Sequence, residues 1–242
     1  MEHIQKNSFA LILGASLILA ATIASFTLYR IRALDNTLSV TGSTKQRVTA
    51  DTAKWGMNIE RIVETDADVA RGFTQVAADM VQVKKFLLAQ GFTESDIEVQ
   101  PTMTGDHYQD NGEGRQVRKI LVSQSVSVTT RTVALVESAS QKTIELAQKN
   151  IRFNAQQPQY LISNLPELRI TLIGKAIEDA KKRAESIAGA MGQRVGRMKS
   201  ANNGVVQVMA PDSTAVSDYG EYDTSTKEKD VMLSVKAVFV LQ

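Results

Sequence analysis

One uninterrupted apolar run near the start of the chain constrains its fold more than any other sequence feature. Residues 9–28 (FALILGASLILAATIASFTL) contain no charged residue, no proline and one glycine. At about 1.5 Å per residue, a helix of this length spans roughly 30 Å, the hydrocarbon thickness of a bilayer. We therefore expect residues 9–28 to form a transmembrane anchor, with residues 1–8 as a short tail before it and residues 29–36 as a linker after it.

Two other interpretations of this run stay open. A buried core helix usually carries one polar stripe, and the few Ser and Thr residues of the run form none. A cleavable signal peptide has an apolar core of about 7–15 residues followed by small residues at the cleavage site. This run is longer, and Ala21-Thr22-Ile23-Ala24 is a mediocre cleavage site. A retained anchor, or uncleaved signal, is the favoured interpretation.

Composition narrows the chemistry that the chain can perform. There is no cysteine, and the two histidines are His3 and His107. Disulfides, thiolate metal sites, cysteine nucleophiles and histidine-rich metal sites are therefore excluded. Beyond residue 32, Lys and Arg equal Asp and Glu at 25 each. Without a basic excess, we expect no nucleic-acid partner.

The body of the chain alternates between strand-like and helix-like hydrophobic periods. Period-two alternation predicts strands at 38–42, 53–63, 97–103, 120–129, 195–198, 205–209 and 231–241. Apolar stripes predict three main helices, over 65–91, 132–150 and 166–191. The expected fold class is α+β, a mostly antiparallel sheet with three main helices, preceded by one N-terminal transmembrane helix. Three helices leave one sheet face to be solvated or shared.

Some positions carry more specific expectations. In the last helix we expect a buried stripe of Leu172 or Ile173, Ile177, Ala180, Ala184, Ile187 and Met191. Gly42 lies within a strand, where a bulge or a close backbone approach is expected. Residues 105–114 are polar and Gly-rich and predict a hairpin loop. Residues 210–230 carry six acidic residues and predict a mobile loop.

Motifs that carry chemistry are weak. The segment Gly112-Glu113-Gly114 lacks the third glycine of a dinucleotide-binding loop, and there is no Gly-x-Ser-x-Gly elbow. His107 has Asp106 and Asp110 as neighbours, which in principle make a metal or acid–base site, although a lone histidine in such a loop is more often solvated. The acids of residues 210–230 lack EF-hand spacing. We expect no catalytic, cofactor-binding or metal-binding residues, and no enzyme; a hydrolase with an unrecognised acid pair is the least favoured reading.

Several short motifs follow one another in a distinctive order along the body. They are Val40-Thr41-Gly42-Ser43 leading to Ala50-Asp51-Thr52-Ala53, then Leu87-Leu88-Ala89-Gln90-Gly91-Phe92 with Asp96-Ile97, then residues 176–184 with Ala188 and Met191-Gly192. In this order they resemble the SIMPL-domain family, which includes bacterial periplasmic immunogenic and oxidative-stress-defence proteins. The resemblance covers about residues 38–241. This chain departs from the family at Val40, at Ala50, and at Tyr108, which remains from a Pro-x-Tyr-x-Tyr loop.

The resemblance implies an α+β fold, export to the bacterial envelope, assembly into large ring- or barrel-like homo-oligomers, and a role in envelope or oxidative stress defence. It offers no catalytic residues to transfer. Lys6 precedes the apolar run while Arg30 and Arg32 follow it, a balance that slightly favours a cytoplasmic body, but the family's exported location outweighs this count.

We therefore expect a non-enzymatic signal-anchored protein of the bacterial inner membrane. Its lipid contact is through residues 9–28, its SIMPL-like domain covers residues 37–242 in the periplasm, and its partner is itself. The alternative is a periplasmic small-ligand or peptide-binding module that uses the loops at 105–117 and 210–230.

Overall fold

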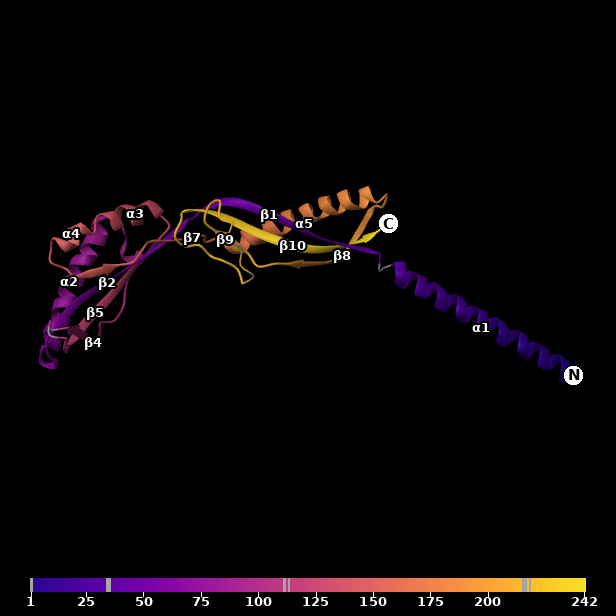
Figure 1. Ribbon diagram of the computed structural model, residues 1–242, viewed down its shortest axis with the longest axis horizontal. Coiled ribbons are helices and arrows are strands. Elements are labelled where there is room, and N and C mark those ends of the chain that lie inside the picture. Colours follow the sequence, from indigo (N-terminus) through magenta and orange to yellow (C-terminus); the bar gives the residue numbers. More distant parts are fainter. Residues whose placement is uncertain (1, 34–35, 111, 113, 215–216, 218) are drawn as a thin grey trace. The chain divides into compact units, whose positions relative to one another are not determined.

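The computed structural model describes residues 2–33, 36–110, 112, 114–214, 217 and 219–242. The first element is the helix α1 (Glu2–Ala33). Within it, the segment Leu13–Arg30 is long and apolar enough to cross a membrane, and none of that segment is buried. The strands and helices of the body follow from Thr37 onward (Figure 1).

The strands form two sheets. The first has the order β1 (Thr37–Thr49), β10 (Glu228–Leu241), β8 (Val195–Asn203), and β9 (Gln207–Met209) also pairs with β10. The second has the order β3 (Ile97–Val99), β5 (Gln116–Thr130), β2 (Thr52–Val63), β6 (Phe153–Ala155); β4 (Met103–Asp110) also pairs with β5, and β7 (Gln159–Leu161) with β2. The second sheet is antiparallel throughout, as is the β10–β8 pair. The predicted α+β fold with mostly antiparallel strand pairing is confirmed, and the strands form two sheets rather than the single sheet expected.

The chain divides into two compact units, which we describe separately. Unit 1 comprises residues up to 45, residues 168–206 and residues 232–242. Unit 2 comprises residues 46–167 and 207–231. The divisions therefore fall inside the strands β1 and β10, in the first turn of the helix α5 (Leu165–Ala190), and just before β9.

In unit 1 the helix α5 (Leu165–Ala190) packs on the sheet through small side chains. Its buried residues recur at every fourth position, namely Leu172, Ala176, Ala180, Ala184 and Ala188. A Cβ added to Gly42 of β1 would lie 2.2 Å from the Ala176 carbonyl oxygen and 2.3 Å from the Ala180 nitrogen. The close backbone approach expected at Gly42 is therefore confirmed. The Ser43 amide also donates to Asp179 Oδ2 at 2.9 Å.

The predicted stripe of this helix is confirmed at Leu172, Ala180 and Ala184, but it is wrong at Ile177, which is half-buried, and at its C-terminal end. Ile187 and Met191 are 43% and 55% exposed, while Ala188 is fully buried. The reason is steric, because a helix that lies this close to a strand has room for methyl groups and must turn its larger side chains outward. The core here consists of Val40, Ala180, Ala184, Ala237 and Phe239.

In unit 2 the core lies between the second sheet and its helices, α2 (Val69–Ala89), α3 (Val133–Gln141) and α4 (Ile144–Ala147). Both α2 and α3 pack against β2 (Figure 1). Trp55 of β2 is 2% exposed, and its Nε1 donates to the Gln156 carbonyl at 2.9 Å. The alternation predicted for 53–63 is confirmed, since Ala53, Trp55, Met57 and Ile59 are buried.

The opposite face of this sheet is polar and partly exposed, with Gly56, Asn58, Ser125 and Ser127 among its residues. Ser125 Oγ donates to Asn58 Oδ1 at 3.1 Å. In the described part of unit 2, this is the face of the sheet that α2, α3 and α4 leave open.

Several boundaries differ from the expected ones. The strand predicted for 97–103 is two strands, and residues 105–110, predicted as loop, belong to β4. Residues 132–150 form two helices that break at Lys142 and Thr143. The predicted mobile loop at 210–230 ends at residue 227, because Glu228 begins β10 and both Lys229 and Asp230 are buried.

Candidate functional site

The cluster of His107 and its acidic neighbours is not assembled in unit 2. In the β4–β5 ladder, His107 lies opposite Lys119 and Asp106 lies opposite Ile120. Neighbouring residues in a strand point to opposite faces, so the side chains of His107 and Asp106 lie on different faces of the sheet. Asp106 Oδ1 instead accepts a hydrogen bond from Arg118 Nε at 2.8 Å. The geometry gives His107 no carboxylate partner from Asp106.

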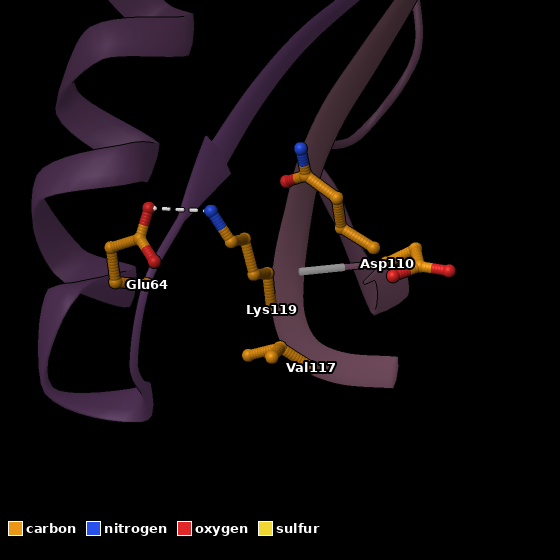
Figure 2. Close-up of a pocket in the computed structure, with 5 residues that line it drawn as sticks. Glu64, Asp110, Val117 and Lys119 are labelled. Atoms are coloured by element: carbon orange, nitrogen blue, oxygen red, sulfur yellow. Dashed lines mark hydrogen bonds and ion pairs between the residues drawn. The ribbon is translucent and has the colours of Figure 1, made fainter. Parts of the chain in front are cut away.

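A hollow of about 400 Å³ lies beside this hairpin, lined by Glu64, Gln109, Asp110, Val117 and Lys119. Lys119 Nζ donates to Glu64 Oε1 at 2.9 Å, and Figure 2 shows this pair on the side of the hollow away from Asp110. Asp110 Oδ1 in turn accepts the Gly112 amide at 2.8 Å. Glu64, Lys119 and Asp110 therefore all form hydrogen bonds within the protein. The hollow offers a polar surface, and its carboxylates are not placed as free general bases.

A second hollow, of about 560 Å³, is rich in hydroxyl groups. Its lining residues are Thr52, Thr93, Asp96, Thr129, Thr130, Arg131, Thr132 and Ser163. They come from four separate stretches of the chain, which is why no local sequence motif indicates them. Thr93 and Asp96 form a capping box at the short 3-10 helix η2 (Glu94–Asp96), so Asp96 has a structural task.

Asp51 controls the orientation of Ser163 in this second hollow. Asp51 Oδ2 accepts from Ser163 Oγ at 2.6 Å, and its Oδ1 accepts from the Ser163 amide at 2.8 Å. Burial acts to raise the pKa of the Asp51 carboxyl, but the hydrogen bonds from Ser163 outweigh burial and lower this pKa. A serine hydroxyl that donates to a carboxylate without an intervening imidazole lacks the general base of a serine hydrolase.

The most deeply buried charges of unit 2 lie within residues 223–230. The Lys229 side chain is 0% exposed, and its Nζ donates to the Asp223 carbonyl oxygen at 2.5 Å, with the Asp223 carboxylate 3.4 Å away. Ser225 and Thr226 also donate to that carboxylate. Burial raises the pKa of the Asp223 carboxyl, but these donors and the charge of Lys229 outweigh it and hold the pKa well below its usual range. Burial lowers the pKa of Lys229 despite the attraction of Asp223.

A second buried carboxylate stands next to this pair. Asp230 accepts hydrogen bonds from Arg47 Nε at 2.9 Å and from the Asp212 amide at 3.0 Å. In the described ranges, every buried side-chain nitrogen and oxygen has a hydrogen-bond partner, and no three His, Asp or Glu side chains gather as metal ligands. The Arg47–Asp230 pair therefore joins residues 207–231 to the rest of unit 2, while Lys229 and Asp223 bond to each other within that segment.

A body with two antiparallel sheets and an exposed apolar helix at its N-terminus defines the class of protein: an α+β module carrying a candidate membrane segment. The chain belongs to the SIMPL family, described as a protein of unknown function (DUF541), whose profile matches residues 38–239. The resemblance drawn from the order of the motifs is thereby confirmed.

Other comparisons add little. No curated protein matches the chain. Among solved structures, the de novo designed protein Foldit4 is 15% identical over 43% of this chain and 93% of its own, with a TM-score of 0.18. A putative aminohydrolase from methicillin-resistant Staphylococcus aureus is 6% identical over 50% of this chain and 32% of its own, with a TM-score of 0.21. Likenesses at these scores carry no argument about fold or function.

Proposed function

We propose that this chain is a non-enzymatic, single-pass envelope protein whose body lies in the periplasm and associates with further copies of itself. The observation that carries the proposal is the state of α1. Leu17, Ile18 and Phe26 are each at least 60% exposed, so folding of the body does not cover this apolar surface. Such a surface is costly in water and stable in hydrocarbon.

The periplasmic side is supported by family membership, because the SIMPL-domain family includes exported proteins. A topology reporter at Gln242, the exposed C-terminal residue, tests the orientation. Alkaline phosphatase fused there is expected to be active, because it folds only outside the cytoplasm, and a fused β-galactosidase is expected to be inactive. The opposite pair of activities would place the body in the cytoplasm and contradict the proposal.

Self-association is supported by the strand edges. In the pairings described, β4 pairs with β5 alone and β8 pairs with β10 alone, so each presents an edge to solvent. Met103 and Tyr108 of β4 are 69% and 60% exposed, and Met198 of β8 is 44% exposed. Exposed edges of this kind add strands from other chains. One anchor per copy raises the local concentration, and head-to-tail contacts between identical copies form rings when the rotation between neighbours closes.

The edge of β4 also favours the alternative, a peptide-binding module, because an extended peptide can pair with the same edge. Native mass spectrometry of the full-length protein released from detergent separates the two. Self-association predicts masses that are whole multiples of the 26.5 kDa chain. A peptide partner predicts increments that are not whole multiples.

A further inference from the structure

The charges of the body are segregated between its two units. Outside α1, unit 1 (34–45, 168–206 and 232–242) has ten Lys and Arg against four Asp and Glu. Unit 2 (46–167 and 207–231) has 15 Lys and Arg against 21 Asp and Glu. All ten basic residues of unit 1 are exposed. The neutral composition of the whole body conceals a strongly basic unit 1.

Unit 1 also contains α1, which is followed along the chain by β1. The helix ends at Ala33 and β1 begins at Thr37. At up to about 3.6 Å per residue, this connection spans at most about 14 Å. If α1 spans a bilayer, the start of β1 therefore stays close to the headgroups, wherever the rest of the body lies.

Backbone hydrogen bonds show which residues share this end of unit 1. The Leu241 amide donates to the Asn36 carbonyl at 2.9 Å, and Leu241 lies opposite Val195 of β8. Arg194 and Gln242 exchange both backbone hydrogen bonds at 2.8 Å. The start of β1, the start of β8 and the C-terminus therefore lie together, as the C-terminal end of β10 and the start of β8 do in Figure 1.

The side chains at this end combine positive charge with exposed apolar surface. Ile187 and Met191, 43% and 55% exposed, lie in and just after the last turn of α5, and Arg194 and Arg197 follow, both exposed. Residues 186–211 contain three basic residues and no acidic one. Basic residues beside exposed apolar side chains are typical of surfaces that lie on anionic membranes. We name Ile187, Met191, Arg194 and Arg197 the membrane-proximal surface.

We propose that the membrane-proximal surface binds the phosphate groups of anionic phospholipids in the same bilayer that holds α1. This inference rests on the proposed function, since it requires α1 to span the membrane. The planar guanidinium groups of Arg194 and Arg197 suit phosphate oxygens, and Met191 and Ile187 enter between the headgroups. The acidic unit 2 of a second copy would also attract this surface. The short tether favours lipid, because it holds the surface at the bilayer at a high effective concentration.

The absence of cysteine from the chain allows a single label to report the position of this surface. Gly189→Cys places a probe on α5, and Gly105→Cys on β4 of unit 2 is its matched control. At both glycines an added Cβ meets nothing within 4 Å, and neither has a positive φ. The full-length variants, labelled with bimane, are reconstituted into phosphatidylcholine vesicles with or without about 30% phosphatidylglycerol. A lipid with a nitroxide headgroup supplies the quencher.

At about 0.1 M salt, we expect quenching at residue 189 to be at least about two-fold stronger in the vesicles with phosphatidylglycerol. This extra quenching, the gain due to phosphatidylglycerol, should disappear near 0.5 M salt, because salt then screens charges within a few Å. Arg194→Gln with Arg197→Gln should abolish the gain. The matched pair Lys54→Gln and Lys85→Gln removes the same charge from exposed positions of unit 2 and should leave it intact. Quenching at residue 105 should not depend on the lipid.

Flotation of the labelled protein with both kinds of vesicle separates this inference from the proposed function. If the protein floats with both and quenching at residue 189 is equal in both, the lipid contact is refuted while the anchor stands. If the protein floats with neither, the anchor and the lipid contact are refuted together. If residue 189 becomes protected in phosphatidylcholine alone as the protein-to-lipid ratio rises, a second copy covers the surface and the lipid contact is wrong.

Discussion

Gly42 decides how closely α5 can approach β1. A side chain there would meet backbone atoms of the helix, at Ala176 and Ala180, rather than movable side chains. The alanines that recur along α5 serve the same close contact from the other side. The sequence indicates Gly42 because glycine inside a strand pattern is unusual, and the partner it admits is visible only in the folded unit.

Gly42→Ala should therefore lower the free energy of unfolding of unit 1 by about 3 kcal/mol, since backbone must shift to admit the methyl group. The matched control is Gly174→Ala in α5, where an added Cβ meets nothing within 4 Å. That change should stabilise the helix by about 0.5–1 kcal/mol. Calorimetry of the full-length variants in detergent measures both, and equal effects from the two changes would refute the packing described.

The pair Asp223 and Lys229 makes the stability of unit 2 depend on pH. The pKa of the Asp223 carboxyl is held below its usual value in the folded state. Its contribution is therefore complete above the unfolded-state pKa, near 4, and is lost as the pH falls toward the folded-state value. Asp223→Asn should cost about 3 kcal/mol at pH 7, because it leaves Lys229 buried without its counter-charge.

Denaturant unfolding at pH 7, 5 and 3 checks this, with the fluorescence of Trp55 reporting unit 2. The difference in the free energy of unfolding between the wild-type chain and the Asp223→Asn variant should shrink below pH 4. Asp110→Asn, at an exposed position, is the control and should change stability by less than about 0.5 kcal/mol. A difference for Asp223→Asn that stays constant across the three pH values would contradict the assignment.

Among the elements, β2 and β4 show what the sequence can and cannot predict. The strand β2 has one buried face, so its apolar residues alternate and its position was predicted correctly. The strand β4 is exposed on both faces apart from His107 and is held by its ladder to β5, so its side chains carry no alternation. Edge strands of this kind resemble loops in sequence.

The polar sites were beyond prediction for a different reason. Arg47, Asp212, Asp223 and Lys229 are far apart in sequence or separated by turns, and only tertiary folding brings their charges together. The hydroxyl-rich hollow likewise draws Thr52, Thr129 and Ser163 from separate segments. Both arise from long-range pairing, which hydrophobic periodicity does not encode.

The described residues of the segment 207–231 (207–214, 217 and 219–231) should behave as a folded element rather than as a mobile loop. The Asp223 amide donates to the Val208 carbonyl at 2.7 Å, and the Tyr160 amide donates to the Thr224 carbonyl at 2.7 Å. Hydrogen exchange at these two amides should be at least about 100-fold slower than in an unfolded chain. Exchange within about ten-fold of unfolded rates would show that the segment opens freely.

For the whole molecule, retention of α1 is the first consequence of the account. Because the run at 9–28 is longer than a signal-peptide core, the protein extracted from membranes should keep its N-terminus. Its intact mass should be 26.5 kDa, and it should resist extraction by alkaline carbonate. A mass lower by about 2–3 kDa, together with release into the soluble fraction, would identify residues 1–24 as a cleaved signal.

The central claim is that an anchored, exported body gathers into closed assemblies of identical copies. Electron microscopy of the full-length protein, purified from membranes in mild detergent, tests anchoring and assembly in one view. The account predicts symmetric particles of many copies, each surrounded by a detergent belt at the side of α1. Isolated single chains at micromolar concentration, with no belt, would contradict it.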